Sequence, residues 1–118
     1  MKQISESLSI RDGRLLFESC DVTRLAEKFG TPLFVISEGH LRSNLRRYKT
    51  AFEQYWPEGH VRIMPALKAC PILAIRRVLS DEGCGCDVFG PGELEGALRG
   101  GVDPSAISVN GSIKDRSI

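Results

Sequence analysis

The chain has 118 residues, of which 42% are hydrophobic and 26% are charged, a composition typical of a globular domain rather than a disordered chain. Its formal net charge is +1, so the overall charge gives no attraction to nucleic acid or to an anionic membrane. No apolar stretch approaches the ~20 residues of a membrane helix, and the amino terminus lacks the apolar core of a signal peptide, which together predict a cytoplasmic location.

The first predicted elements are a hairpin and a short helix. Residues 10–17 surround Asp12 and Gly13, a turn pair that tolerates positive φ and favours a hairpin. Asp21 can cap a helix over residues 22–29, whose apolar side chains share one face before a glycine ends it.

A strand and a long helix follow. Residues 33–37, LFVIS, form a β-branched and aromatic run that predicts a strand buried on both faces. Residues 38–55 place apolar side chains at helical spacing. The other face of this helix carries four basic side chains: Arg42, Arg46, Arg47 and Lys49. We interpret them as a solvated face, the alternative being contact with an anion or a partner.

The middle of the chain predicts a second strand and a second long helix. Residues 61–69, VRIMPALKA, read as a strand, although Pro65 weakens that interpretation or marks a bulge. Pro71 stands where the first turn of a helix accepts proline, and the apolar stripe after it ends at Gly83.

The last predicted elements are a strand at residues 84–89, a helix at 90–101 and a strand at 107–111. The element order is therefore βαβαβαβ. Short connections in this order imply parallel strands with right-handed helical crossovers, either in an open doubly wound sheet or in a barrel.

Polar side chains gather where these strands end. In both architectures ligands bind at the carboxyl ends of the strands, and Lys68 lies at one such end. Four more polar residues lie at or just beyond the ends of the next two strands: Asp87, Glu93, Asn110 and Lys114. The sequence stops at Ile118, in what should be the opening turn of another helix, so we expect an amino-terminal piece of a larger protein.

The four cysteines are expected to stay reduced, because the chain has no export signal and enough residues for a core. Cys84 and Cys86 form a C-x-C, which as a zinc site would need two more ligands nearby. His40 and His60 follow no ligand spacing. We therefore expect small buried or half-buried thiols and no metal site.

Lys68 is a lysine in unusual surroundings. It lies within residues 64–70, MPALKAC, where its neighbours are small and apolar. Such neighbours disfavour the charged form of an amine, and we expect them to supply dry surroundings for this one. The alternative is a structural lysine that extends from a strand end or pairs with Asp87 or Glu93.

Three stretches in this order, FGTPLFVIS, MPALKAC and GCGCDVFGPGELEGALRGGVDPSAISVNGSIKD, carry a resemblance. They resemble the opening of the fold-type III pyridoxal-phosphate-dependent decarboxylases, which have an alanine-racemase-like barrel. Within that family the likeness is greatest to the diaminopimelate decarboxylases, with the ornithine and arginine enzymes as relatives. The resemblance covers nearly all of the chain from about Leu15.

The resemblance implies an α/β fold in which residues 31–118 form the first β/α units of a pyridoxal-phosphate-binding (β/α)₈ TIM barrel. Residues 1–30 would form a strand and helix segment that belongs to, or lies near, a second β-domain. The family also implies a homodimer in the full-length protein and a small-molecule amino-acid substrate. The 118-residue piece alone should lack activity, because it holds few of the groups that tune the cofactor ring.

The resemblance also implies site residues. Lys68 would form a Schiff base with pyridoxal 5'-phosphate, and Ala66, Asp87 and Glu93 would help bind the cofactor. Glu93 also lies inside a helix amino terminus, where a carboxylate can be purely structural. Asn110 and Lys114 match the loop after the fourth strand, and as loop and capping residues they need no function.

The implied reaction is decarboxylation of an amino acid, first of all diaminopimelate to lysine. The family usually has asparagine where this chain has Cys70, and commonly tyrosine or a similar residue where Pro65 stands. These departures leave the role of Lys68 intact and make a divergent relative acting on another amino acid the alternative. The alternatives are a racemase or an ornithine- or arginine-type decarboxylase on the same barrel. A non-catalytic homologue that binds a protein partner is the third reading.

Overall fold

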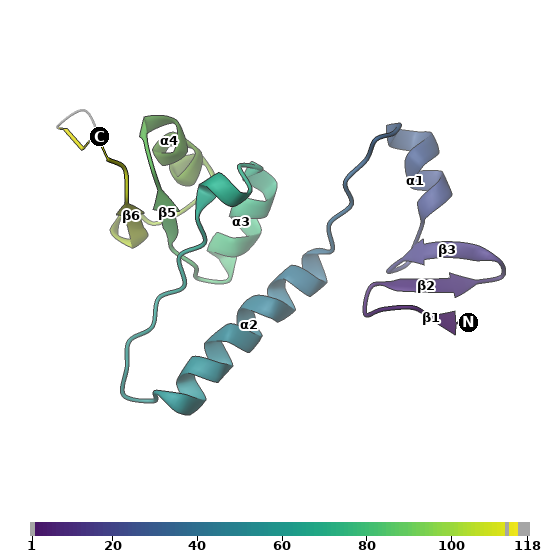
Figure 1. Cartoon of the computed structure of the whole chain (residues 1–118), viewed down its shortest axis with the longest axis horizontal. Coiled ribbons are helices and arrows are strands. Elements are labelled where there is room, and N and C mark those ends of the chain that lie inside the picture. The colour runs from purple at the N-terminus through teal and green to yellow at the C-terminus, as the bar shows by residue number, and fades with distance from the viewer. Residues whose placement is uncertain (1, 113, 116–118) are drawn as a thin grey trace. The chain divides into compact units, whose positions relative to one another are not determined.

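The computed structural model describes residues 2–112 and 114–115, and the chain divides into two compact units, Met1–Leu41 and Arg42–Ile118 (Figure 1). The helix expected to open near Ile118 lies outside the described residues. None of the described helices is long and apolar enough to cross a membrane.

The first unit begins with a small antiparallel sheet in the order β1-β2-β3-β4. Its strands are β1 (Lys2–Gln3), β2 (Leu8–Arg11), β3 (Arg14–Phe17) and β4 (Cys20–Asp21). Arg11 pairs with Arg14 across a two-residue turn in which Asp12 has φ 51° and Gly13 has φ 75°. Both values are left-handed, as the tightest hairpin turns require, so the hairpin prediction is confirmed.

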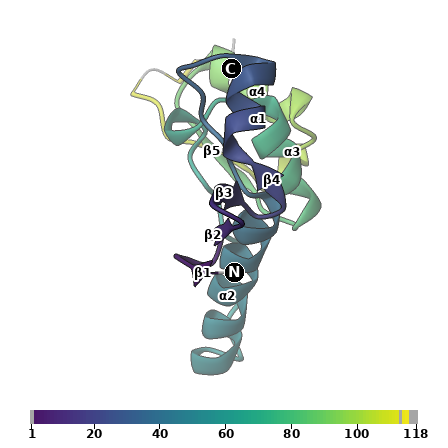
Figure 2. The same ribbon diagram turned by 90° about the vertical axis from the view of Figure 1, so that its right-hand side faces the viewer.

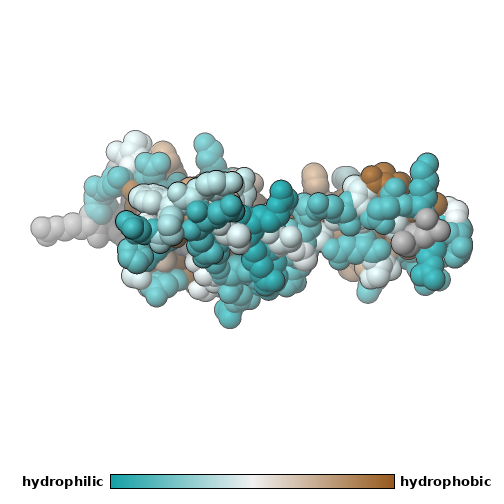
Figure 3. All heavy atoms as spheres, turned by 90° about the horizontal axis from the view of Figure 1, so that it is seen from below, coloured by the Kyte–Doolittle hydropathy of each residue, from teal (hydrophilic) through white to brown (hydrophobic). Residues whose placement is uncertain are grey.

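Helix α1 (Val22–Phe29) has the predicted bounds and caps. The Asp21 carboxylate accepts hydrogen bonds from the backbone N–H groups of Thr23 at 2.9 Å and Arg24 at 3.3 Å. Gly30 ends the helix with φ 82°, which favours glycine. In Figure 3 most of the visible surface is hydrophilic, and the most strongly hydrophobic patch in this view lies over the first unit.

The strand predicted at residues 33–37 is wrong. The segment is irregular, its apolar side chains from Leu33 to Ile36 are exposed, and Phe34 is 94% exposed. A buried parallel strand is stabilised by hydrogen-bonded neighbours on both sides, and no described strand pairs with this segment. Its composition favours a strand, but composition alone supplies no partner.

The long helix predicted at residues 38–55 is confirmed as α2 (Glu38–Tyr55), which is one continuous helix in Figures 1 and 2. Ser37 lies just before it, accepts the backbone N–H of His40 at 2.9 Å and donates its hydroxyl hydrogen to the Glu18 carboxylate. His40 Nδ1 also lies 2.9 Å from the Glu6 carboxylate. The start of α2 is therefore tied to the loops of the small sheet.

The basic face of α2 is not simply a solvated face, because three of its four cations contact Glu82. Arg42 donates to the Glu82 carboxylate at 2.9 Å, and Arg46 donates to both oxygens at 2.9 and 2.7 Å. Lys49 donates to the Glu82 backbone carbonyl. Glu82 follows α3 (Leu73–Asp81), so these contacts join α2 to the end of α3. The solvated interpretation is therefore wrong for the half-buried Arg42 and Lys49, whereas Arg46 and Arg47 are exposed.

The Glu82 cluster predicts a specific acid sensitivity. Hydrogen bonds from Arg46 and Arg42 lower the pKa of Glu82 from 4.5 to about 2. Because this pKa is lowered in the folded chain, the carboxylate stabilises the fold above pH 4.5, and that contribution is lost as the pH falls through about 2. In the full-length protein we expect Glu82→Gln to lower stability at neutral pH and to flatten its pH dependence in this window, measured by urea denaturation.

A matched substitution on an exposed loop, Glu58→Gln, should leave the pH dependence of the wild-type protein unchanged. A Glu82→Gln protein whose stability falls as steeply as that of the wild type between pH 4.5 and about 2 would show that the cluster contributes nothing.

The second unit contains a parallel βαβ arrangement. Strand β5 (Cys86–Val88) pairs in parallel with β6 (Ile107–Val109), and α4 (Pro91–Arg99) connects them, followed by the 3₁₀ turn η2 (Pro104–Ala106). The two last predicted strands and the helix between them are confirmed. Helix α3 begins two residues after Pro71 rather than at it, because Ile72 takes the N-cap position.

Residues 61–69 were predicted to form the second strand, and this prediction is wrong, although part of the segment lies beside β5. Gly85 N–H donates to the Ile63 carbonyl at 2.9 Å, and only Ala66 forms a parallel bridge, with Asp87. Pro65 has no N–H to donate, so the ladder is incomplete. The chain then enters the 3₁₀ turn η1 (Leu67–Ala69).

One hydrophobic core lies between the parallel β5–β6 sheet and α4. Its buried members are Leu67, Cys86, Val88, Ala97 and Val102. Among the described residues all four cysteines are free thiols: Cys84 and Cys86 are buried, Cys70 is half-buried and Cys20 is exposed. Burial raises the pKa of the Cys84 thiol, which suits a packing role.

Candidate functional site

Three parallel segments lie side by side in the second unit, in the order 63–66, β5, β6. The register places Ala66 beside Asp87 and Asp87 beside Ser108. Because parallel segments end at the same edge, the residues that follow them meet there. Lys68 follows Ala66 by two residues, and Asn110, whose N–H donates to the Val88 carbonyl at 2.8 Å, follows Ser108 by two. The register therefore brings these strand ends to one edge, and the convergence of their polar side chains stays a prediction.

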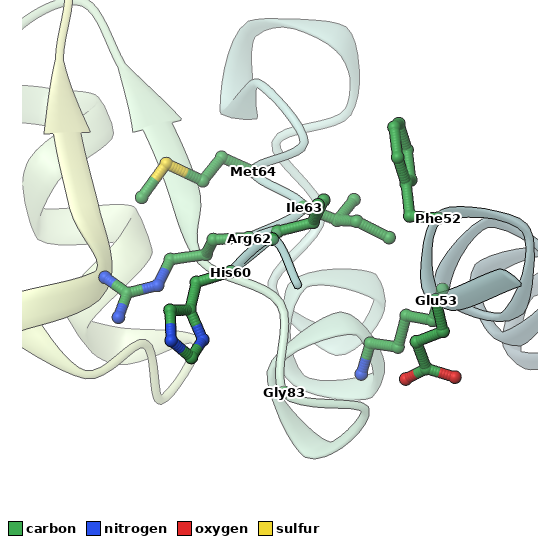
Figure 4. Close-up of a pocket in the computed structure, with 10 residues that line it drawn as sticks. Phe52, Glu53, His60, Arg62, Ile63, Met64 and Gly83 are labelled. Carbon is green, nitrogen blue, oxygen red and sulfur yellow. The ribbon is translucent and has the colours of Figure 1, made fainter. Parts of the chain in front are cut away.

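The two faces of this arrangement differ. Cys86 and Val88 point into the core with α4, and their partners Ile107 and Val109 pack against it. Side chains alternate along a strand, so Asp87 lies on the face opposite α4, which we call the helix-free face. Figure 4 shows the same alternation in the neighbouring segment, where Ile63 points toward Phe52 of α2 and Met64 points the other way, toward the strands.

Lys68 lies on η1 and is exposed, so the prediction of dry surroundings is wrong for the described residues. The apolar character of the stretch belongs to Leu67, which is 4% exposed and packs into the core. Lys68, one residue later, lies outside that core. No described hydrogen bond or ion pair joins Lys68 to Asp87 or Glu93, so the alternative of a structural pair is not observed either.

Glu93 has a structural partner. Its carboxylate accepts a hydrogen bond from the backbone N–H of Phe89 at 2.8 Å, across the turn between β5 and α4. This contact fixes the turn and satisfies a donor at the helix amino terminus. A Cβ atom at Gly90 or Gly92 would meet no atom within 4 Å, so the space above this turn is open.

Asn110 and Lys114 are both exposed. The backbone of Asn110 is bound to β5, whereas no described contact joins Lys114 to the rim. Sequence reasoning missed Ser108, which is half-buried beside Asp87. A period-two reading of the last strand would have found it, because Ser108 is the one polar residue among the three of β6.

One cavity of the second unit lies away from this rim. It has a volume of about 760 Å³ between α2 and residues 59–64, and Figure 4 shows Phe52 and Glu53 on one side and His60, Arg62 and Ile63 on the other. Residues 59–64 precede Ala66, so the cavity is near the amino ends of the parallel segments. Since ligands of such folds bind at the carboxyl ends, we place the candidate site at the rim and not in this cavity.

The rim can perform amine chemistry. Lys68 offers an exposed primary amine, which can attack a carbonyl carbon, and Asp87 offers a half-buried carboxylate on the helix-free face. Among the described residues no group of three or more His, Cys, Asp and Glu side chains could hold a metal ion.

Comparison with known proteins matches this chain to one protein family and to named enzymes. Residues 38–118 match the family model described as "Pyridoxal-dependent decarboxylase, pyridoxal binding domain". The chain is 40% identical over 114 residues to the diaminopimelate decarboxylase of Methanocaldococcus jannaschii, and the match covers 95% of this chain and 26% of that protein. The enzyme of the same name from Methanothermobacter thermautotrophicus is 40% identical over 100 residues, which cover 85% of this chain and 23% of that protein.

Solved structures agree with the sequence matches. The crystal structure of the M. jannaschii diaminopimelate decarboxylase in co-complex with L-lysine superimposes with a TM-score of 0.87 at 39% identity, covering 95% of this chain and 26% of that chain. The chain therefore spans about a quarter of the length of the relatives it matches. The predicted fold class, the opening part of a pyridoxal-phosphate-binding barrel, is confirmed by these matches.

Proposed function

The chain belongs to the pyridoxal-dependent decarboxylase family, and from this we propose that the full-length protein decarboxylates an amino acid with pyridoxal 5'-phosphate bound covalently to Lys68. The observation that carries the proposal is the position of Lys68. Its amine is exposed, lacks a described partner and lies at the carboxyl ends of parallel segments, inside the region that matches a pyridoxal binding domain.

The residues of the rim fit this cofactor. An aldehyde needs a free primary amine for covalent attachment, and Lys68 provides one. Ala66, in register with Asp87, has a side chain small enough to leave room on the helix-free face. Asp87 would hold the Lys68 amine by its negative charge, and Glu93 would keep the turn above α4 in place through Phe89.

When bound, pyridoxal phosphate supplies an electron sink that accepts the electrons left behind when carbon dioxide departs. The residues of this chain supply binding and proton transfer. Lys68 would anchor the cofactor, and its Nζ would hold or move a proton at the rim. Asp87 would orient the Lys68 amine. Neither role needs a metal ligand from this chain.

The substrate proposed first is diaminopimelate, with lysine as the product. The support is the printed name of the relatives, at 40% identity over most of this chain. The alternatives are a racemase, an ornithine- or arginine-type decarboxylase, and a non-catalytic homologue. The departures at Pro65 and at Cys70, which is half-buried two residues after Lys68, keep these alternatives open.

The reaction is tested with the purified full-length protein and pyridoxal phosphate. We expect carbon dioxide release from diaminopimelate in at least about 10²-fold excess over ornithine or arginine, since a site built for one polar side chain rejects analogues that leave its groups unpaired. A chiral product assay runs in parallel. Release of the opposite enantiomer without carbon dioxide would instead identify a racemase, and turnover of none of these amino acids would favour the non-catalytic homologue.

The wider organisation is also a proposal. Residues 1–30 would belong to, or lie near, a second β-domain, and the antiparallel sheet of the separate unit Met1–Leu41 supports a segment of its own. We propose a cytoplasmic homodimer for the full-length protein. Cross-linking or light scattering of the purified protein measures that state directly.

A further inference from the structure

One large apolar side chain lies at the carboxyl end of β5. Phe89 directly follows Val88, the last residue of the strand, and is 56% exposed. A single exposed apolar side chain on an outer surface needs no explanation. Phe89 differs in its position, because it stands at the edge of the parallel segments where ligands of such folds bind.

Strand alternation indicates the face on which Phe89 lies. Cys86 and Val88 are buried in the core with α4, whereas Phe89 is neither a described member of that core nor packed against it. Side chains alternate along an extended chain, so Phe89, two residues after Asp87, belongs with it on the helix-free face. The exposure of Phe89 agrees with this position.

The register brings Phe89 near Lys68 along the same edge. Ala66 lies beside Asp87, and Lys68 and Phe89 each follow this bridge by two residues. The chain turns into η1 after Ala66, which keeps the backbone of Lys68 close to the end of β5. Neighbouring parallel segments lie about 4.8 Å apart, so a group attached to the long, flexible Lys68 side chain can reach the Phe89 ring.

The backbone of Phe89 is held in place beside open space. Its N–H donates to the Glu93 carboxylate at 2.8 Å, across the turn that joins β5 to α4. A Cβ atom at Gly90 or Gly92 would meet no atom within 4 Å, so this turn leaves room for a ligand. Ligand sites are lined mostly by apolar and aromatic side chains held by rigid elements, and Phe89 meets both conditions.

We propose that Phe89 forms the apolar wall of the cofactor site and that its ring packs against the pyridine ring of pyridoxal phosphate bound to Lys68. The inference rests on the proposed function, which attaches the cofactor to Lys68. The Lys68 side chain is exposed, so its neighbours in sequence do not keep water away from it. An aromatic ring packed on the cofactor supplies that exclusion once the cofactor is bound, and its contact area adds affinity without a covalent bond.

The test measures the Kd of the full-length apoprotein for pyridoxal phosphate by equilibrium dialysis, in wild type, Phe89→Ala and Phe89→Leu. We expect Phe89→Ala to raise the Kd roughly tenfold, because the contact between the two rings is lost. Phe89→Leu keeps a large apolar side chain and should stay within about threefold of wild type. Hydroxylamine should strip the bound cofactor from Phe89→Ala roughly tenfold faster than from wild type, because the attachment point is open to solvent.

Tyr55→Ala is the matched control, since Tyr55 is an aromatic residue at the end of α2 and is 81% exposed. This variant should keep the wild-type Kd and stripping rate. If Phe89→Ala also keeps both values while the cofactor stays attached to Lys68, the inference is overturned and the proposed function stands. If borohydride trapping shows no cofactor on Lys68 of the wild-type protein, the proposed function itself is overturned, and the inference with it.

Circular dichroism of each variant checks that it folds. If Phe89→Ala does not fold, Phe89→Gln replaces it, because glutamine occupies more of the space of the ring but is polar. A wild-type Kd and stripping rate in Phe89→Gln would then overturn the inference.

Discussion

Replacing Lys68 with alanine in the full-length protein is expected to abolish covalent attachment of pyridoxal phosphate and to lower kcat on the order of 10³-fold or more. The reason is chemical, because no other side chain at the described rim offers a primary amine near Asp87. Lys68 is exposed and lies outside the core, so its removal should leave folding intact. The measurements are borohydride trapping, carbon dioxide release and the circular dichroism spectrum.

A matched control is Lys114→Ala, which removes a lysine from the loop after β6 and has no described contact with the rim. It should keep labelling and turnover near the wild-type values. Unchanged trapping in Lys68→Ala, with the label found on another lysine, would contradict the assignment of the anchor and with it the proposed function.

The second large effect is expected at Gly85. A Cβ atom there would overlap the backbone carbonyl oxygen of Ala106 and come within 3.0 and 3.1 Å of the Met64 Cγ and Cε atoms. The carbonyl belongs to the backbone just before β6 and cannot move aside without breaking the β5–β6 ladder. We expect Gly85→Ala to destabilise the full-length protein by roughly 3 kcal/mol or more, measured by urea denaturation.

Gly92 supplies the matched control, since a Cβ there meets no atom within 4 Å and the residue lies in a helix. Gly92→Ala is expected to be neutral or to stabilise by up to about 1 kcal/mol. Equal stability of the Gly85→Ala and wild-type proteins would show that the close approach of the two segments is absent in solution.

The elements predicted correctly from the sequence are those whose signals are local. The Asp12-Gly13 turn, the Asp21 cap and the proline that begins α4 each act within a few residues of the element they define. Local chemistry therefore decides the hairpin and the helix bounds without knowledge of the rest of the fold.

The predictions that failed depend on contacts between distant residues. Residues 33–37 have strand composition but no described strand beside them. Three cations of α2 looked solvated because Glu82 lies 33 or more positions further along the chain. The burial of Arg76 also depends on a distant residue. Arginine is rarely buried, yet Arg76 is 1% exposed, because its Cβ and Cγ atoms pack where a Cβ atom of Gly100 would be.

The predictions for the candidate site also divide into one part that succeeded and one part that failed. Lys68, Ala66 and Asp87 were identified from the sequence through a family resemblance, and the register places Ala66 and Asp87 in contact. The environment of Lys68 was not predicted correctly, because the buried residue of that stretch is its neighbour Leu67. The roles of these residues in catalysis stay predictions until the variants are measured.

The exposed stretch from Leu33 to Ile36 has a consequence for biosynthesis. It precedes every strand of the parallel pair, so it leaves the ribosome first and waits while β5, α4 and β6 assemble from residues close together in the chain. During this interval the nascent polypeptide presents four consecutive apolar side chains to solvent. Slow synthesis would lengthen the interval and so promote aggregation at this stretch.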